Sequence, residues 1–370
     1  MIKEISSFSQ VELSGEAFVV YDANVSWIAE QIIGPGVVGA IAIDATEENK
    51  TMDTVLLICR SMMEAGLSRS GEVVCIGGGI TSDIGGFAAS IYKRGVSYVN
   101  VPTTLLAQVD AGIGGKCGVN FDGLKNMLGA IVQPRVTYIC AEALRTLPKR
   151  VLLCGVAEMM KTFLIADSSA YEEFCRRGVS VFAAEKCDKN TSPTSAVAQG
   201  QTEVPGPCAS EVPGGPICAQ GVDHLVRPCA SELILTAARI KSGIVEEDPY
   251  EKGKRAVLNL GHTFAHGIEH VAGVRGDDVA HGEAVAMGIV LAARLGDRLY
   301  GTALEPRIAG DFERVGLPVK CPYALEELVP AMCKDKKGAG EKVKFVLLED
   351  IGKPKFEMLA PAEAVEILSR

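Results

Sequence analysis

Three features that mark other protein classes are missing from this chain of 370 residues. No apolar run approaches the ~20 residues that a membrane-spanning helix needs, so a membrane protein is not expected. No block of lysine or arginine occurs and the formal net charge is −9, which argues against a nucleic-acid partner. The N-terminus, MIKEISSFSQ, lacks the charged and then apolar layout of a signal peptide. An acidic chain can still hold a local basic pocket for a small phosphorylated substrate.

Cysteine pairs of the CxxC type are also absent, although the chain has twelve cysteines. Several of them, such as Cys59, Cys75, Cys140 and Cys154, lie inside apolar runs, where a reduced thiol behaves as a small hydrophobic side chain. We therefore expect a reducing compartment, the cytoplasm, with neither disulfides nor a cysteine-type zinc site.

The first part of the chain alternates short apolar runs with helical patterns. Residues 17–22, 37–44, 72–79 and 96–102 have the pattern of strands, and a helical pattern covers 49–65. Alternation of this kind predicts an α/β fold, with a parallel sheet covered by helices. With 48% apolar residues, a chain of this length can build two ordinary domains or one large one.

Helical patterns dominate the second part of the chain. They occupy residues 155–166, 230–246, 261–272, 281–300, 304–315 and 324–334. We expect an α/β domain over 1–150 and a mostly helical domain over 151–370, with the site in the cleft between them. Residues from about 184 to 227 are rich in Pro, Gly, Ser and Thr, and PCASE occurs at both 207–211 and 228–232, so a flexible surface insertion is predicted.

Three segments combine polar residues with glycine or apolar surroundings. GGGITSDIGGF (77–87) follows a predicted strand and opens a helix, where a dinucleotide phosphate can bind, although the spacing is not GxGxxG. Residues 101–130 mix lysines, asparagines and an aspartate with many glycines, which suits either an anionic ligand or a solvated loop. GVAEMMKT (155–162) places Glu158 three residues before Lys161, as a helical ion pair or as a buried carboxylate that needs a metal or cation.

Histidines gather in a fourth segment. NLGHTFAHGIEH (259–270) holds three of the five histidines, and HGEA follows at 281–284. His262 and His266, at i and i+4, share a helical face that can bind a metal, but the sequence is not HExxH. A catalytic zinc site takes three protein ligands and leaves one position open. The candidates are His262, His266, His281, Glu158, Glu269 and Glu283.

Together, these segments resemble the 3-dehydroquinate synthase family. GGGITSDIGGF, YKRG, VPTTLLAQVDAGIGGKCGVN, KNMLGA, GVAEMMK, NLGHTFAHGIEH, HGEA and DKK occur in the family's order, and the resemblance covers the chain except about 184–227. It implies an α/β domain that binds NAD, and a helical domain that supplies the metal, Zn²⁺ or Co²⁺, and much of the substrate site. It also implies a homodimer.

The resemblance assigns roles to single residues. The metal ligands are expected to be Glu158, His262 and His281, whereas His266 is expected to face the substrate, so the resemblance disagrees with helical spacing. NAD is expected against Asp22, Asn24, Glu47, Lys50, Gly78, Gly79, Asp83, Thr103, Thr104, Asp110 and Lys125. Substrate contacts are expected from Arg94, Asp110, Lys116, Asn126, Lys161, Lys241, Arg255, Asn259, His266 and one of Lys336 and Lys337.

The implied reaction is the lyase step of the shikimate pathway that closes a ring in aromatic amino acid biosynthesis. The substrate, 3-deoxy-D-arabino-heptulosonate 7-phosphate, is oxidised at C5 by NAD and loses phosphate. It is then reduced again, and an intramolecular aldol step gives 3-dehydroquinate without net redox change. Lys161, Lys241 and Arg94 are expected around the phosphate. Arg255 and Asn126 are expected at the substrate carboxylate, which a planar guanidinium can bind through two hydrogen bonds.

Three alternatives remain at this stage. A related cyclase acting on sedoheptulose 7-phosphate or glucose 6-phosphate would not need the carboxylate partners that Arg255 and Asn259 offer. A metal-dependent alcohol or glycerol dehydrogenase would share the fold and produce net NADH. A non-catalytic paralogue is disfavoured because Glu158, His262 and His281 are all present.

Overall fold

The computed structural model describes residues 1–182, 228–334 and 342–370. The predicted insertion at about 184–227 and both Lys336 and Lys337 lie outside these described residues.

A six-stranded sheet organises the N-terminal part, and all of its strand pairs are parallel. Its strand order is β1-β8-β5-β4-β2-β3. The strands are β1 (Ile2–Glu4), β2 (Ala17–Asp22), β3 (Val37–Ile43), β4 (Glu72–Gly77), β5 (Ser97–Pro102) and β8 (Thr137–Ile139). The predicted parallel sheet is confirmed, and the four predicted strands correspond to β2, β3, β4 and β5.

Side chains that alternate along the central strands enter a separate core on each face of the sheet. On one face, Val19 of β2 and Val74 of β4 belong to the core that includes α1 (Ser26–Ile32). On the other face, Val20 and Cys75 belong to the core that includes α2 (Met52–Glu64) and α3 (Gly79–Ile91). Burial on both faces explains why these strands read as continuous apolar runs.

Helices make up most of the described residues after residue 148. They are α4 (Lys149–Ala166), α5 (Ser168–Arg177), α6 (Pro228–Glu247), α7 (His262–Arg275), α8 (His281–Tyr300), α9 (Glu305–Val315), α10 (Leu325–Lys334) and α11 (Pro361–Ser369). The predicted helices are confirmed, and α4 begins six residues earlier than predicted. None of the described helices is long and apolar enough to cross a membrane.

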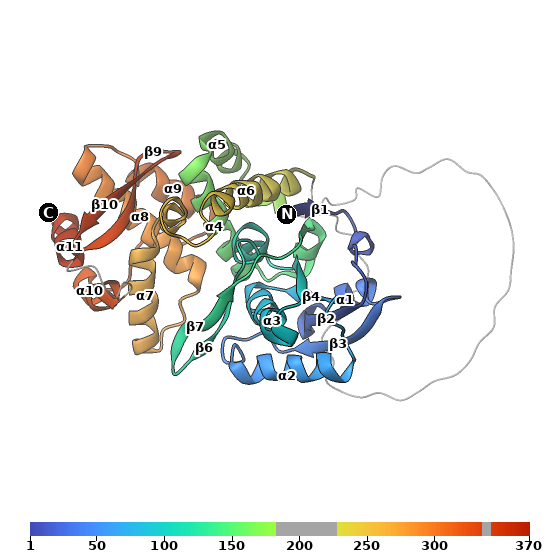
Figure 1. The fold of residues 1–370 in the computed structure, drawn as a ribbon. Helices are drawn as coiled ribbons and strands as arrows, with labels where there is room; N and C mark the ends of the chain where they lie inside the picture. Colours follow the sequence, from blue (N-terminus) through green and yellow to red (C-terminus); the bar gives the residue numbers. More distant parts are fainter. Residues whose placement is uncertain (183–227, 335–341) are drawn as a thin grey trace, which may run out of the picture.

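Two antiparallel hairpins complete the described part of the fold, and neither was predicted. The first, β6 (Lys116–Phe121) with β7 (Leu124–Ile131), lies within the polar and glycine-rich segment 101–130. The second joins β9 (Val343–Asp350) to β10 (Lys353–Leu359) in the part that was expected to be helical. Figure 1 shows the sheet on one side of the molecule, the helices α7 to α11 with β9 and β10 on the other, and α4, α6 and the first hairpin between them.

Candidate active site

Close packing of α8 against α4 and α7 brings three helices together, and glycines allow the approach. At Gly282 of α8, a Cβ atom would lie 2.2 Å from the Cα of Cys154 in α4. At Gly288 of α8, a Cβ atom would lie 2.2 Å from the carbonyl oxygen of Gly261, the N-cap of α7. Gly261 has a φ of 77°, in the left-handed region that favours glycine. The packing therefore sets the first turns of α7 and α8 beside the middle of α4.

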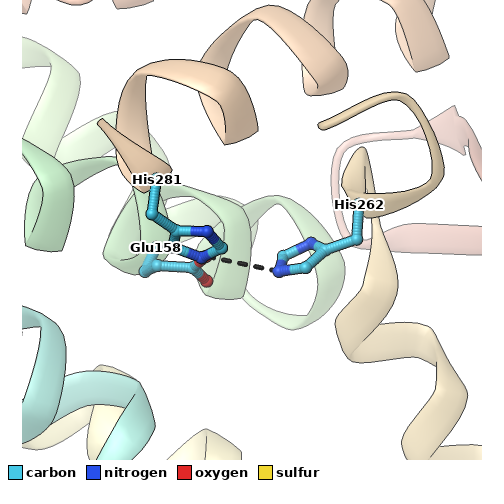
Figure 2. A group of neighbouring side chains, drawn as sticks. All are labelled: Glu158, His262 and His281. Carbon is cyan, nitrogen blue, oxygen red and sulfur yellow. Dashed lines mark ion pairs between the residues drawn. The ribbon is translucent and has the colours of Figure 1, made fainter. Parts of the chain in front are cut away.

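Glu158 of α4, His262 of α7 and His281 of α8 point toward one another from these three helices (Figure 2). The Nε2 atoms of His262 and His281 lie 3.4 Å and 3.3 Å from Oε1 of Glu158. One candidate ligand atom from each residue lies within 4.8 Å of the others. His266 lies outside this group, although its ring centroid is 5.8 Å from that of His262. The structure thus brings together the residues that the resemblance selects, instead of the pair that helical spacing favours.

The chemistry of this group fits a divalent metal ion. Glu158 is fully buried, and neither of its carboxylate oxygens makes a hydrogen bond of normal geometry within the described part of the chain. Lys161 Nζ lies 2.5 Å from Oε2, which leaves Oε1 facing the two histidines. Burial opposes ionisation of Glu158, but the charges of Lys161 and His262 outweigh it and hold the pKa well below its usual range. Two imidazoles and one carboxylate are a ligand set found at catalytic zinc sites.

Gly282→Ala should force α8 away from α4. The new methyl group would overlap the backbone of Cys154, which cannot turn aside as a flexible side chain can. We expect the free energy of unfolding to fall by about 2 kcal/mol and zinc to bind more weakly. Urea denaturation and competition with a chelator measure the two effects. Gly273→Ala in α7 is the control, because a Cβ atom there meets nothing within 4 Å. Equal stability and zinc affinity in Gly282→Ala and the unmodified protein would contradict the close approach.

A pocket of about 640 Å³ adjoins the metal-ligand group and is lined by both halves of the chain. Ten residues predicted from the sequence lie in its wall: Asp83, Asp110, Lys116, Asn126, Lys161, Lys241, Arg255, Asn259, His262 and His266. The pocket therefore lies where the α/β part and the helical part meet, as expected for a site between them.

Two buried lysines share Asp110 at the wall of this pocket. Nζ of Lys241 lies 2.6 Å from Oδ1 of Asp110 and donates a hydrogen bond to its carbonyl oxygen at 2.7 Å. Nζ of Lys161 lies 3.7 Å from the same Oδ1. The two lysine side chains are only 7% and 2% exposed. Burial lowers the pKa of Lys241, although the attraction of Asp110 opposes this change. Both lysines line the wall of the pocket, so their ammonium groups are placed to contact a phosphate group of a ligand.

Arg255 is a third buried cation of the pocket, and it is held by backbone carbonyl groups. Its Nη1 donates to Pro249 O at 2.8 Å and its Nη2 to Gly114 O at 3.2 Å. Among the described residues, no carboxylate oxygen lies close enough to the Arg255 guanidinium to form an ion pair, for which the limit is 4.0 Å. Burial lowers the pKa of Arg255. A buried guanidinium in this state is suited to an anionic group of a ligand.

Glu251 is a pocket residue that was not predicted from the sequence. It forms an ion pair with Lys116 and accepts a hydrogen bond from Nδ2 of Asn259 at 2.9 Å. Both partners are predicted substrate residues, so Glu251 connects the first hairpin to the helical part at the pocket. Glu251 has a φ of 53°, which is uncommon for a residue other than glycine. The only signal in the sequence is its place among the charged residues that precede NLGH.

The residues predicted to bind NAD follow the carboxyl ends of adjacent strands. Strand β3 lies on one side of β2 in the sheet, and the next strand, β4, lies on the other side of β2. The strand order therefore reverses at β2. Ligands of open parallel sheets bind at such a point. Helix α3 begins at Gly79, directly after β4, and its free N–H groups favour a phosphate. The predicted residues at or after the carboxyl ends of these strands are Asp22, Asn24, Glu47, Lys50, Gly78, Gly79, Asp83, Thr103 and Thr104. This part of the sheet fits a dinucleotide.

Several of the predicted NAD residues already contact one another. Lys50 Nζ lies 2.6 Å from Oδ2 of Asp83 and 2.5 Å from Oδ1 of Asn126. Burial raises the pKa of Asp83 to about 6, against the attraction of Lys50. Glu47 accepts a hydrogen bond from Nδ2 of Asn120 in β6 at 2.8 Å. Asn126, expected at the substrate carboxylate, is therefore also part of the group on the NAD side.

Two other predicted residues lie away from this cluster. Arg94 is exposed at the end of the short helix η3 (Tyr92–Arg94) and is not part of the pocket wall. Lys125 is 65% exposed on the first hairpin, with its Nζ 4.0 Å from Oε1 of Glu269. The contact of Arg94 with phosphate and that of Lys125 with NAD stay predictions.

The two halves of the chain match two consecutive family models. Residues 40–154 match the model described as 3-dehydroquinate synthase N-terminal, and residues 219–338 match 3-dehydroquinate synthase C-terminal. A 3-dehydroquinate synthase from Geobacter metallireducens is 37% identical over 83% of this chain and 74% of its own length. This chain belongs to the 3-dehydroquinate synthase family. Another member, from Pyrococcus abyssi, is 34% identical over 90% of this chain and 85% of its own length. The predicted family is thus confirmed.

Solved structures support the same fold. ValA, the 2-epi-5-epi-valiolone synthase of Streptomyces hygroscopicus subsp. jinggangensis with NAD⁺ and Zn²⁺ bound, has a TM-score of 0.77 and 26% identity. The match covers 100% of this chain and 95% of that one. A 2-deoxy-scyllo-inosose synthase, at 21% identity, matches with a TM-score of 0.73 over 100% of this chain and 96% of its own. The predicted fold class is confirmed.

Proposed function

We propose that this protein converts 3-deoxy-D-arabino-heptulosonate 7-phosphate into 3-dehydroquinate and phosphate. The pocket carries the proposal, because its buried cations, Lys161, Lys241 and Arg255, lie beside a group suited to a divalent metal. The substrate has two anionic ends, a phosphate and a carboxylate, and the pocket offers two separate kinds of cation for them. Membership of the 3-dehydroquinate synthase family supports the same reaction.

NAD and a Zn²⁺ or Co²⁺ ion are the proposed cofactors; when bound, NAD accepts and returns hydride, and the metal acts as a Lewis acid. Glu158, His262 and His281 would hold the metal. The turn from Gly78 to Gly79 would present N–H groups to the NAD phosphates. The presence of NAD⁺ and Zn²⁺ in ValA supports this assignment.

The lysines and the arginine would divide the two ends of the substrate between them. Lys161 and Lys241 would neutralise the phosphate and favour its departure, while Asp110 holds the Lys241 side chain in place through the contacts described above. Arg255 would orient the carboxylate with its planar guanidinium. Cyclases whose substrates lack a carboxylate have no need of such a buried cation, so Arg255 favours the proposed substrate over sedoheptulose 7-phosphate.

We also propose a homodimer and a domain division near residue 150.

The deciding experiment measures phosphate release from 3-deoxy-D-arabino-heptulosonate 7-phosphate with catalytic NAD. The protein is tested as purified, after chelation, and after zinc is returned. We expect release that needs both NAD and metal, with no accumulation of NADH. Net NADH production would favour a polyol dehydrogenase. Release from sedoheptulose 7-phosphate alone would favour the related cyclase, and no release from folded, metal-loaded protein would refute the proposal.

A further inference from the structure

Glu269 lies on the side of His281 that faces away from Glu158. It belongs to α7, seven residues after His262, and so lies about two turns along the same helix. Its Oε1 atom is 3.3 Å from Nδ1 of His281. The other ring nitrogen, Nε2, is 3.3 Å from Oε1 of Glu158. The imidazole of His281 therefore lies between two carboxylates, with one nitrogen directed toward each.

This arrangement selects one form of the neutral imidazole ring. An ionised carboxylate can only accept a hydrogen bond, so in a neutral ring that binds a metal through Nε2, Glu269 accepts the proton that remains on Nδ1 of His281. The lone pair of Nε2 is then directed toward the proposed metal ion, which Glu158 would share. His262 has a comparable contact, because its Nδ1 lies 3.2 Å from the carbonyl oxygen of Leu260, which also can only accept. Both histidines are thereby arranged to bind a metal through Nε2.

We propose that Glu269 is a positioning residue for the metal site: it orients His281 and keeps the Nε2 lone pair free for the ion. Glu269 is not part of the group whose candidate ligand atoms lie within 4.8 Å of one another, so it acts through His281 and does not bind the ion itself. The side chain of Glu269 is 22% exposed, which makes its contact with His281 stronger than a fully solvated one. This inference rests on the metal site of the proposed function.

The contact joins the start of one helix to the middle of another. His281 is the first residue of α8, and Glu269 lies near the middle of α7. An unconstrained imidazole at a helix start can rotate about its side-chain bonds and lose its orientation toward the ion. Carboxylates that hold a metal-binding histidine in this way typically contribute a factor of about 10 to 100 in metal affinity.

Metal titration of the full chain tests the inference without relying on activity. Metal-free protein is titrated with Zn²⁺ against a chromophoric chelator, and the visible spectrum of the Co²⁺-loaded protein is recorded. Glu269→Ala should weaken zinc binding about 10- to 100-fold and alter the Co²⁺ bands. Glu269→Gln should lose less, because its amide oxygen can still accept the Nδ1 proton. The control is Glu327→Ala. Glu327 belongs to α10 and is the exposed ion-pair partner of Arg275, the last residue of α7, so this variant should bind zinc as the unmodified protein does.

The outcomes separate this inference from the proposed function. If the unmodified protein does not bind zinc or cobalt, the metal site itself is refuted. If it binds zinc and Glu269→Ala has the same affinity and the same Co²⁺ spectrum, only the role of Glu269 is overturned. Complete loss of metal from a folded Glu269→Ala would also overturn it, since that result requires a direct ligand. Should the alanine variant not fold, Glu269→Asp, which withdraws the carboxylate by one methylene, replaces it with the same readouts and the same criteria.

Discussion

Glu158→Gln should lose bound zinc and reduce phosphate release about a thousandfold. The substitution keeps the shape of the side chain but removes the only anionic member of the three-residue group. A Lewis-acid metal contributes several kcal/mol to transition-state stabilisation, which corresponds to a rate factor of this order. The zinc content after dialysis and the rate of phosphate release with NAD measure the two losses.

The matched control for this variant is Glu232→Gln, an exposed glutamate on α6. It should keep both zinc and activity. Because Lys161 loses its nearest carboxylate in Glu158→Gln, circular dichroism and urea denaturation should confirm that the variant is folded. A folded Glu158→Gln that retains stoichiometric zinc and the full rate would rule out Glu158 as a metal ligand.

Asp110→Asn should lower the free energy of unfolding by about 3 kcal/mol, and inorganic phosphate should restore part of the loss. Removing one partner of a buried ion pair leaves the other charge buried and costs roughly 3–5 kcal/mol. We expect the lower end of this range of destabilisation because the side chain of Asp110 is 24% exposed. A neutral asparagine cannot offset the charges of Lys161 and Lys241, whereas a phosphate ion bound between them can.

Urea denaturation in chloride and in phosphate at equal ionic strength measures both parts of this effect. Phosphate should stabilise Asp110→Asn more than it stabilises the unmodified protein. Asp297→Asn is the control, because Asp297 accepts hydrogen bonds from Thr302 and from the N–H groups of Leu304 and Glu305, with no cation involved. It should lose stability without any additional gain from phosphate. The same phosphate effect in both variants would show that Lys161 and Lys241 do not form an anion site.

Local patterns in the sequence were sufficient for most of the regular structure. Short apolar runs indicated the strands β2, β3, β4 and β5, in which side chains alternate every two residues. Apolar residues spaced three to four apart indicated the long helices. The hairpin of β9 and β10 was missed because a short apolar run such as VKFVLL fits a buried strand or part of a buried helix equally well.

The candidate metal group shows the limit of such reasoning. Spacing within one helix reports only which residues share its face, and so it paired His262 with His266. Resemblance to the family was needed to select Glu158 and His281, which lie on two other helices.

By itself, the sequence determined the kinds of element outside the two hairpins, the parallel sheet and the residue types of the site. Only the tertiary structure decided which helix ends meet. The close contacts at Gly282 and Gly288 set α8 against α4 and α7, and that packing places His281 between Glu158 and Glu269. The role of Glu269 could not be predicted for the same physical reason: its partner lies twelve residues away on another helix, and the distance between them depends on how the two helices pack.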